Sequence, residues 1–213
     1  MKKLLFLTLA IGVYACGSGP DPLPIPDLDA PDATAATFIN PDHFTANWDE
    51  APNATGYELE IAKDIEFTNV TNIEKGVVSG VILWGMESKT QYFYRVRATN
   101  ASQSPSPNSN IISLYTLPVP PIASAATNVS SNGFTANWNE VPGISNYLLY
   151  LSLDNFTSSP PVYVAGYEGK DVTGLTHDVT GLNSRTIYYY AIKAKGEESI
   201  SFFSNAIFVE TTN

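Results

Sequence analysis

Apolar and polar side chains alternate along short runs of the chain from about residue 30 onward. Residues 57–61 read Y-E-L-E-I and residues 92–98 read Y-F-Y-R-V-R-A. In a β-strand every second side chain points to the same face, so we expect the sets that begin with Tyr57 and Tyr92 to face inward. Clusters of Pro, Gly, Asn and Ser separate the runs, and no segment longer than ten residues keeps a helical period. The pattern predicts an all-β chain folded into two-sheet sandwiches.

These runs form a sequence repeat. Residues 35–48 (A-A-T-F-I-N-P-D-H-F-T-A-N-W) match residues 125–138 (A-A-T-N-V-S-S-N-G-F-T-A-N-W) at an offset of 90. Residues 85–98 match residues 181–194 at an offset of 96, so the second copy carries an insertion between about 152 and 180. We predict a first domain over 30–117 and a second over 118–213, with a loop-rich insertion in the second.

The two copies meet at residues 116–122, T-L-P-V-P-P-I. Three prolines in seven residues make a linker stiff, because each proline fixes its own φ angle. We therefore expect a semi-rigid rod with the second domain outermost.

The N-terminus reads as an export signal. Lys2 and Lys3 precede an apolar run over residues 4–13, which is too short to span a bilayer as a helix. The run ends in V-Y-A-C, which resembles a bacterial lipobox with Cys16 as the lipidated residue. An ordinary secretory cleavage after residue 15 would instead release a soluble protein that begins with Cys16. Lipidation is the favoured interpretation, because the only cysteine of the chain stands where a lipobox requires it.

The segment after Cys16 is rich in proline and aspartate. Residues 16–29 read C-G-S-G-P-D-P-L-P-I-P-D-L-D, a composition that favours an extended tether. Lipidation of Cys16 would make the membrane a partner of this chain. We expect an outer-membrane lipoprotein of the bacterial cell envelope, on either the periplasmic or the surface side.

Particular residues of both copies resemble the fibronectin type III family across essentially all of residues 30–213. Each copy has one tryptophan on its second strand, Trp48 or Trp138, and a later L-x-x-x-T-x-Y-x-x-x-V-x-A pattern, with Met86 for the Leu in copy one and Ile192 for the Val in copy two. The resemblance implies two tandem fibronectin type III-like (immunoglobulin-like) β-sandwiches, with both tryptophans in the cores. It also implies that Tyr92 and Tyr188 are tyrosine-corner residues whose hydroxyl groups bond to nearby backbone. The F-T-A-N-W phrase is similar to repeats in secreted and surface proteins of Bacteroidota.

Composition narrows the possible functions. The net charge is −10, which disfavours nucleic-acid binding through phosphate neutralisation. One cysteine and two separated histidines leave no internal disulfide and little for a transition-metal site, and no cofactor-binding motif occurs. We expect no metal and no cofactor.

Candidate catalytic groups are few. Glu58 and Glu60 share a face of one strand, the one arrangement that suggests paired carboxylates, but outward sheet positions explain them better. His43 and His177 have no nucleophile or metal-spacing partner nearby in the sequence and are interpreted as solvated surface residues. We expect a protein that is not an enzyme.

Differences between the copies point to binding surfaces. Trp84 aligns with Thr180, and alternation beside Leu83 turns the indole outward. An exposed tryptophan is either a stacking platform for sugars or a partner contact, or else it is shielded by a neighbouring loop or by the other domain.

A second difference lies on the outer sides of two strands in copy two. Copy one presents Glu58, Glu60, Phe93 and Arg95 there, and copy two presents Leu148, Tyr150, Tyr189 and Ala191. The apolar set is a candidate partner site on the second domain, although cross-strand aromatic pairs also stabilise sheets without any partner.

These expectations combine into one functional hypothesis and one alternative. The hypothesis is a noncatalytic cell-envelope lipoprotein that acts as a protein-interaction, adhesion or spacer module. The alternative is a glycan-binding accessory lipoprotein that supports polysaccharide capture, with Trp84 and the tyrosine-rich face as stacking residues.

Overall fold

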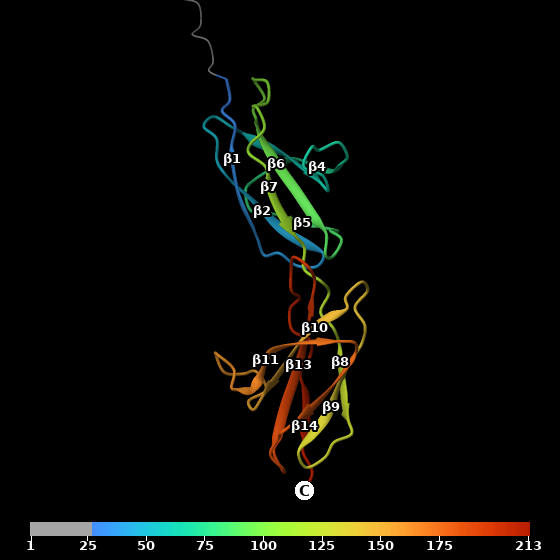
Figure 1. Ribbon diagram of the computed structural model, residues 1–213. Helices are drawn as coiled ribbons and strands as arrows, with labels where there is room; N and C mark the ends of the chain where they lie inside the picture. Colours follow the sequence, from blue (N-terminus) through green and yellow to red (C-terminus); the bar gives the residue numbers. More distant parts are fainter. Residues whose placement is uncertain (1–26) are drawn as a thin grey trace, which may run out of the picture.

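The computed structural model describes residues 27–213, which form two β-domains placed end to end (Figure 1). The predicted signal peptide (1–15), Cys16 and most of the predicted tether lie outside the described residues. Within residues 27–213 no helix is long and apolar enough to cross a bilayer.

The first domain is a sandwich of two antiparallel sheets. One sheet has the order β1-β2-β5 and the other has the order β4-β3-β6-β7. Its strands are β1 (Asp32–Thr37), β2 (His43–Asp49), β3 (Gly56–Ala62), β4 (Val70–Val77), β5 (Val81–Trp84), β6 (Gln91–Thr99) and β7 (Ile112–Tyr115).

The second domain repeats this topology, with sheets ordered β8-β9-β12 and β11-β10-β13-β14. Its strands are β8 (Ala123–Thr127), β9 (Gly133–Trp138), β10 (Asn146–Ser152), β11 (Tyr163–Thr173), β12 (Thr176–Thr180), β13 (Ile187–Lys195) and β14 (Ile207–Glu210). All fourteen strands fall within the two predicted sequence copies, and the all-β prediction is confirmed.

The side chains that the alternation predicted to face inward are buried. The inward set that begins with Tyr57 on β3 and the set that begins with Tyr92 on β6 are buried between the sheets. Trp48 and Trp138 are also buried and pack against Tyr57 and Tyr147, with ring centroids 5.4 and 5.6 Å apart. Each domain therefore has its own core around one tryptophan–tyrosine pair.

Both tyrosine corners form. The Tyr92 hydroxyl accepts a hydrogen bond from the Glu87 backbone N–H at 3.0 Å, and the Tyr188 hydroxyl accepts one from the Asn183 N–H at 3.0 Å. Each bond connects the start of a long central strand to the loop that precedes it.

The predicted boundaries need one correction. Leu28 was assigned to the tether, but its side chain is buried in the core of the first domain. Because the Leu28 side chain packs within this core, the folded part of the chain begins before residue 30.

The insertion in the second copy lies in β11 and in the loop before it. β11 has 11 residues where β4 has 8, and the loop 153–162 replaces the shorter loop 63–69. β11 pairs with β10 through two register irregularities, as β4 does with β3. The irregularity between Tyr150 and Ser152, where two steps along β10 correspond to five along β11, accommodates additional residues at the edge of the sheet.

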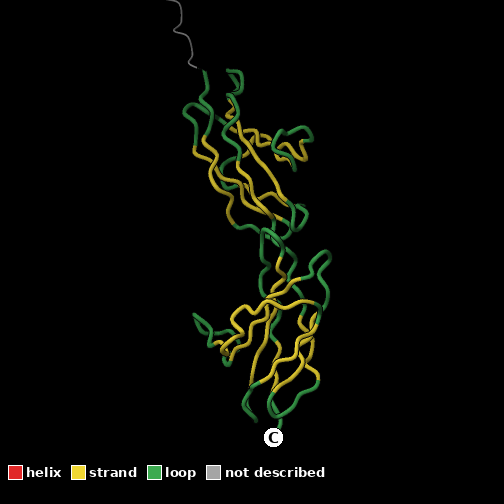
Figure 2. The backbone as a smooth tube through the Cα atoms, viewed as in Figure 1, coloured by secondary structure: helices red, strands yellow, loops and turns green. Residues whose placement is uncertain are grey.

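The linker is bonded to both domains. Figure 2 shows that loops of the two domains, rather than strands, meet at the junction. Lys89 Nζ of the first domain donates to the Pro142 carbonyl oxygen at 2.7 Å, and Ser199 Oγ of the second domain donates to the Thr116 carbonyl oxygen at 3.1 Å. Ile122 N–H at the end of the linker donates to Asn139 Oδ1 at 2.5 Å. The first of these bonds joins the two domains directly, and the other two hold the linker to the second domain. On the other side, Leu117 N–H of the linker donates to the Asn40 carbonyl oxygen of the first domain at 3.3 Å.

Candidate interaction surfaces

The outer face of the first domain carries ion pairs across its two central strands. Across β3 and β6, the register places Glu58 opposite Arg97 and Glu60 opposite Arg95. Arg97 donates to Glu58 through Nε at 2.7 Å and also through Nη2, and Arg95 donates to Glu60 at 2.7 Å. Lys75 adds a third cation, 3.2 Å from Glu58. Both candidate carboxylates of the sequence are therefore bound by arginines of the neighbouring strand.

This pairing changes the acidity of Glu58. The hydrogen bond from Arg97 lowers the pKa of the Glu58 carboxyl, and Lys75 lowers it further, although partial burial acts in the opposite direction. A carboxylate held ionised by two cations suits a structural role and not that of a general acid.

Phe93 also faces outward from the main core of the first domain, but it is not exposed. It forms a small buried cluster with Ala62 and with Phe67, which belongs to the loop between β3 and β4. The Arg95 guanidinium lies 4.1 Å from the centroid of the Phe67 ring and covers it from the solvent side. No open apolar surface remains at this position.

The equivalent face of the second domain carries aromatic rings instead. The Tyr150 ring packs edge-on against Phe203 with centroids 4.8 Å apart, and Phe156 lies 5.6 Å from Phe203. Tyr163 lies 5.8 Å from Tyr150 and 6.2 Å from Phe156. We call these four residues, Tyr150, Phe156, Tyr163 and Phe203, the aromatic patch. Two of them stand in loops outside the strands, at 153–162 and 196–206.

Lys193 on β13 belongs to the same surface. Its Nζ atom lies 4.1 Å from the Phe203 ring centroid and 5.6 Å from that of Tyr150. Burial among these side chains lowers the pKa of the Lys193 ammonium and raises that of the Tyr150 hydroxyl. Both groups are thus partly withdrawn from water.

Two members of the predicted apolar set are corrected by the structure. Leu148 is only 8% exposed and Ala191 only 1%, so neither offers a surface to a partner. They do lie outside the main core, but larger side chains on the outer face, such as that of Tyr150 opposite Ala191, cover them. Leu148 is therefore not a contact residue for a partner.

Tyr189 is partly exposed and extends the apolar surface towards β14. Its ring meets Phe208 edge-on with centroids 5.9 Å apart. Phe208 is exposed, as is Ile187 on the same side of β13. The second domain therefore presents rings over four strands and two loops, where the first domain presents ion pairs.

Trp84 is 63% exposed and lies at the end of β5. Its ring stacks on His43 of β2, with centroids 4.0 Å apart, and the two residues are cross-strand partners. The other domain does not shield the indole, and one ring face is occupied by His43. In the second domain the register places Gly133 and Thr180 at the equivalent positions, so only the first domain has this ring pair.

Both histidines keep part of their surface exposed, but neither is fully solvated. His43 is largely covered, because it stacks on Trp84 and its Nδ1 lies 2.7 Å from Asp42 Oδ1. His177 is half-buried beside Tyr167, with ring centroids 6.3 Å apart, and burial lowers the pKa of its imidazole. Both rings serve packing between neighbouring strands.

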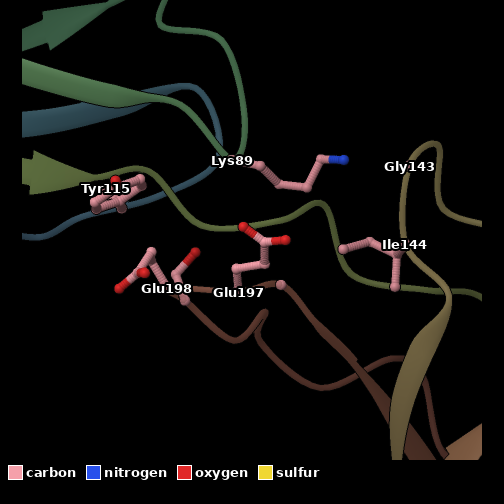
Figure 3. A pocket seen from close by; sticks show the side chains of 8 residues that line it. Lys89, Tyr115, Gly143, Ile144, Glu197 and Glu198 are labelled. Carbon is pink, nitrogen blue, oxygen red and sulfur yellow. The ribbon is translucent and has the colours of Figure 1, made fainter.

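A cleft opens at the junction of the two domains. Lys89 and Tyr115 line it from the first domain, and Ile144, Glu197 and Glu198 line it from the second (Figure 3). The Lys89 side chain extends towards Gly143, where it makes the bond to the Pro142 carbonyl described above. The cleft therefore belongs to the contact that joins the domains. Among residues 27–213 no cluster of three or more His, Cys, Asp or Glu side chains could hold a metal ion.

Sequence reasoning missed three residues of this surface: Phe156, Tyr163 and Phe203. A signal for two of them was present, because the insertion that breaks the repeat carries Phe156 and Tyr163. Phe203 in the second copy stands at the position of Asn108 in the first. The serines that follow them, Ser109 and Ser204, show this equivalence, because each accepts a hydrogen bond from a backbone N–H at the same position of β6 or β13.

Comparisons with protein-family models and with curated protein sequences gave no match. Among solved structures, the chain is similar to a two-domain fibronectin type III segment of chicken tenascin, with a TM-score of 0.50 and 17% identity, over 86% of this chain and 100% of that one. The FN1–FN3 domains of chicken CNTN1 align with a TM-score of 0.42 and 16% identity, over 87% of this chain and 69% of that one.

The tenascin likeness and the sheet orders define the class of fold: a β-sandwich of the immunoglobulin-like type, present twice. More particularly, each domain has the fibronectin type III fold, and the prediction of two tandem copies is confirmed.

Proposed function

We propose that this chain is a noncatalytic lipoprotein of the bacterial cell envelope, which holds a protein-binding domain away from the membrane. Lipidation at Cys16 is the anchor, the proline-rich segment is the tether, and the outer face of the second domain is the binding surface. The first domain and the bonded linker act as the spacer between them.

The observation that carries the binding role is the contrast between two equivalent sheet faces. In the first domain, Arg95 and Arg97 satisfy Glu60 and Glu58, and Phe93 is covered. In the second domain Tyr150 and Tyr189 stand at the positions of Glu60 and Phe93, and Phe203 remains 38% exposed at the centre of the aromatic patch. Because exposed clusters of aromatic side chains are characteristic of interfaces, the difference favours a partner for the second domain only.

The observations that support the spacer role are the end-to-end arrangement and the bonds across the junction (Figure 1). A linker that is bonded on both sides transmits orientation better than a free one. The patch would thus stand at a set distance from the first domain.

The anchor is tested by intact mass, membrane fractionation and surface protease accessibility of the native protein and of Cys16→Ala. We expect a lipid mass increment on the native protein and release of Cys16→Ala into the soluble fraction. An unmodified, soluble native protein that begins at Cys16 would overturn the anchor and leave a secreted adaptor.

The binding surface is tested by site-specific photocrosslinking in intact cells. A photoreactive residue in place of Phe203 is expected to give a discrete protein adduct that Tyr150→Ala or Tyr189→Ala weakens. The same residue in place of Asn108, at the equivalent position of the first domain, is the matched control and is expected to give none. Equal adducts at both positions, or adducts insensitive to Tyr150→Ala, would contradict the proposed surface.

A second candidate function, glycan capture, is favoured by Trp84. One face of its indole is occupied by His43, and the side chain as a whole remains 63% exposed, which suits stacking on a sugar ring. In a saccharide panel, glycan capture predicts binding that Trp84→Ala abolishes, whereas the protein-interaction function predicts no saccharide dependence on Trp84.

A further inference from the structure

Lys193, which lies against the aromatic patch, has no carboxylate opposite it, unlike the equivalent arginine of the first domain. On β3 and β6 the register places Glu58 opposite Arg97, and on β10 and β13 it places Leu148 opposite Lys193 at the equivalent position. The second domain has therefore kept the cation of this pair and replaced the carboxylate by an apolar side chain.

Nothing within residues 27–213 replaces the lost carboxylate. No Asp or Glu of these residues forms an ion pair with Lys193, whereas Lys195, two residues further along β13, pairs with Asp171 at 2.5 Å. The contacts of the Lys193 ammonium are the rings of Phe203 and Tyr150. A ring face attracts a cation, but it does not accept the strong hydrogen bonds that a carboxylate accepts.

In the free protein, the Lys193 ammonium therefore has no carboxylate partner among residues 27–213. Partial burial withdraws the ammonium from water, as its lowered pKa indicates. A ligand that brings a carboxylate would supply the missing partner in a site already shielded from solvent, where such a pair contributes most to specificity.

The shape of the patch distinguishes between kinds of ligand. The interplanar angles are 78° between Tyr150 and Phe203 and 47° between Tyr150 and Tyr163, so these rings do not form one flat platform. Rings that meet at steep angles form notches that side chains fill, whereas a sugar stacks on a flat ring face. The geometry favours a peptide ligand over a glycan.

We propose that the aromatic patch binds a segment of a partner protein in which an aspartate or glutamate stands beside an apolar side chain, with the carboxylate paired to Lys193. This inference rests on the proposed function and names the chemistry of its partner. The apolar side chain packs on Phe203 and Tyr150, and the carboxylate supplies to Lys193 the charge that Glu58 supplies to Arg97 in the first domain.

The test uses the mature chain with Cys16→Ala and two matched sets of synthetic peptides. Each peptide of the first set carries one glutamate and one phenylalanine at varied spacing, and the second set has glutamine in place of the glutamate. We expect glutamate peptides to bind the native surface roughly tenfold more tightly than their glutamine counterparts. Lys193→Met should abolish that preference, Lys193→Arg should keep it, and Lys170→Met on neighbouring β11 should not change it.

A second variant tests the same pairing from inside the protein. Leu148→Glu recreates the acid that the first domain has at this position, so Lys193 is expected to pair internally and the preference for glutamate peptides should disappear. Circular dichroism and thermal unfolding check that the variant is folded. A preference that survives in both Lys193→Met and folded Leu148→Glu would overturn the proposal.

The outcomes separate this inference from the proposed function. Equal binding of both peptide sets, weakened by Tyr150→Ala, would overturn the carboxylate and leave protein binding in place. Peptide binding that neither Tyr150→Ala nor Phe203→Ala weakens would overturn both, as would no peptide binding at all. Lys193-dependent binding of polygalacturonate, or Lys193-dependent self-association of the chain, in place of peptide binding would show that the occupant is an acidic glycan or a second copy, and would overturn the peptide.

Discussion

The ammonium of Lys193 lies 4.1 Å from the ring centroid of Phe203, on a sheet position where the first domain has an arginine bound to glutamate. The two domains share a fold but differ at this position. The first domain pairs its cation with a carboxylate of the same domain, and the second domain places its cation against aromatic rings. This difference leads to predictions about stability as well as about binding.

Replacement of the two cations by methionine should have opposite effects on stability. Lys193→Met removes a partly buried charge that lacks a carboxylate, so the free energy of unfolding should rise by on the order of 1 kcal/mol. Arg97→Met leaves Glu58 with Lys75 alone and should lower it by about 1–3 kcal/mol. Chemical denaturation of both variants measures the two values, and destabilisation by Lys193→Met would show that its ring contacts outweigh its burial.

Removal of either tyrosine-corner hydroxyl should weaken only the domain that contains it. Tyr92→Phe leaves the Glu87 N–H without its acceptor, and Tyr188→Phe does the same for the Asn183 N–H. Each change should cost about 1 kcal/mol, the usual net value of such a hydrogen bond. Hydrogen exchange resolved by residue separates the two domains, and loss of protection in both domains from one substitution would contradict independent cores.

The first domain should lose stability in acid through Glu58. Its pKa is lower in the folded state than its ordinary value of 4.5, so folding is favoured by its ionisation. That stabilisation is complete above the unfolded-state pKa and is lost as the pH falls through the folded-state pKa. Glu58→Gln should therefore flatten the dependence of unfolding free energy on pH below about 4.5.

A matched control for Glu58→Gln is Glu66→Gln, because Glu66 is exposed and forms no ion pair within the described chain. It should leave the acid limb of the stability curve nearly unchanged. An equal flattening by both variants would mean that overall charge, and not the pairing with Arg97, governs the acid response.

The junction should loosen when its side-chain donors are removed. Lys89→Met removes the bond to the Pro142 carbonyl, and Ser199→Ala removes the bond to the Thr116 carbonyl. The double variant should broaden the distribution of distances between spin labels placed on the two domains, with Lys170→Met as a control of equal charge change. An unchanged distribution would indicate that the proline-rich linker alone sets the arrangement.

The alternation of apolar and polar residues predicted the sandwich, because this alternation can be read from neighbouring residues of the sequence. The side of each strand follows from alternation alone, so the inward sets that begin with Tyr57 and Tyr92 were placed correctly. The core positions of the two tryptophans followed instead from the family resemblance. Alternation does not say what covers an outward side chain, which is why Leu148 was expected at the surface and is buried.

The aromatic patch could be predicted only in part, for a related reason. Phe156 and Phe203 stand in loops, where no period assigns a direction to the side chain, and they meet Tyr150 only through the three-dimensional path of those loops. The stack of His43 on Trp84 depends in the same way on the register between β2 and β5, which the sequence pattern leaves undetermined.

Both side-chain bonds across the junction end on main-chain oxygen atoms, those of Pro142 and Thr116. Every amino acid brings such an oxygen, so a change of side chain at either acceptor leaves the bonding atom in place. For these two bonds, therefore, only the donors, Lys89 and Ser199, depend on residue identity. Substitutions at the two acceptors leave both bonds available, whereas a change at either donor removes one of them.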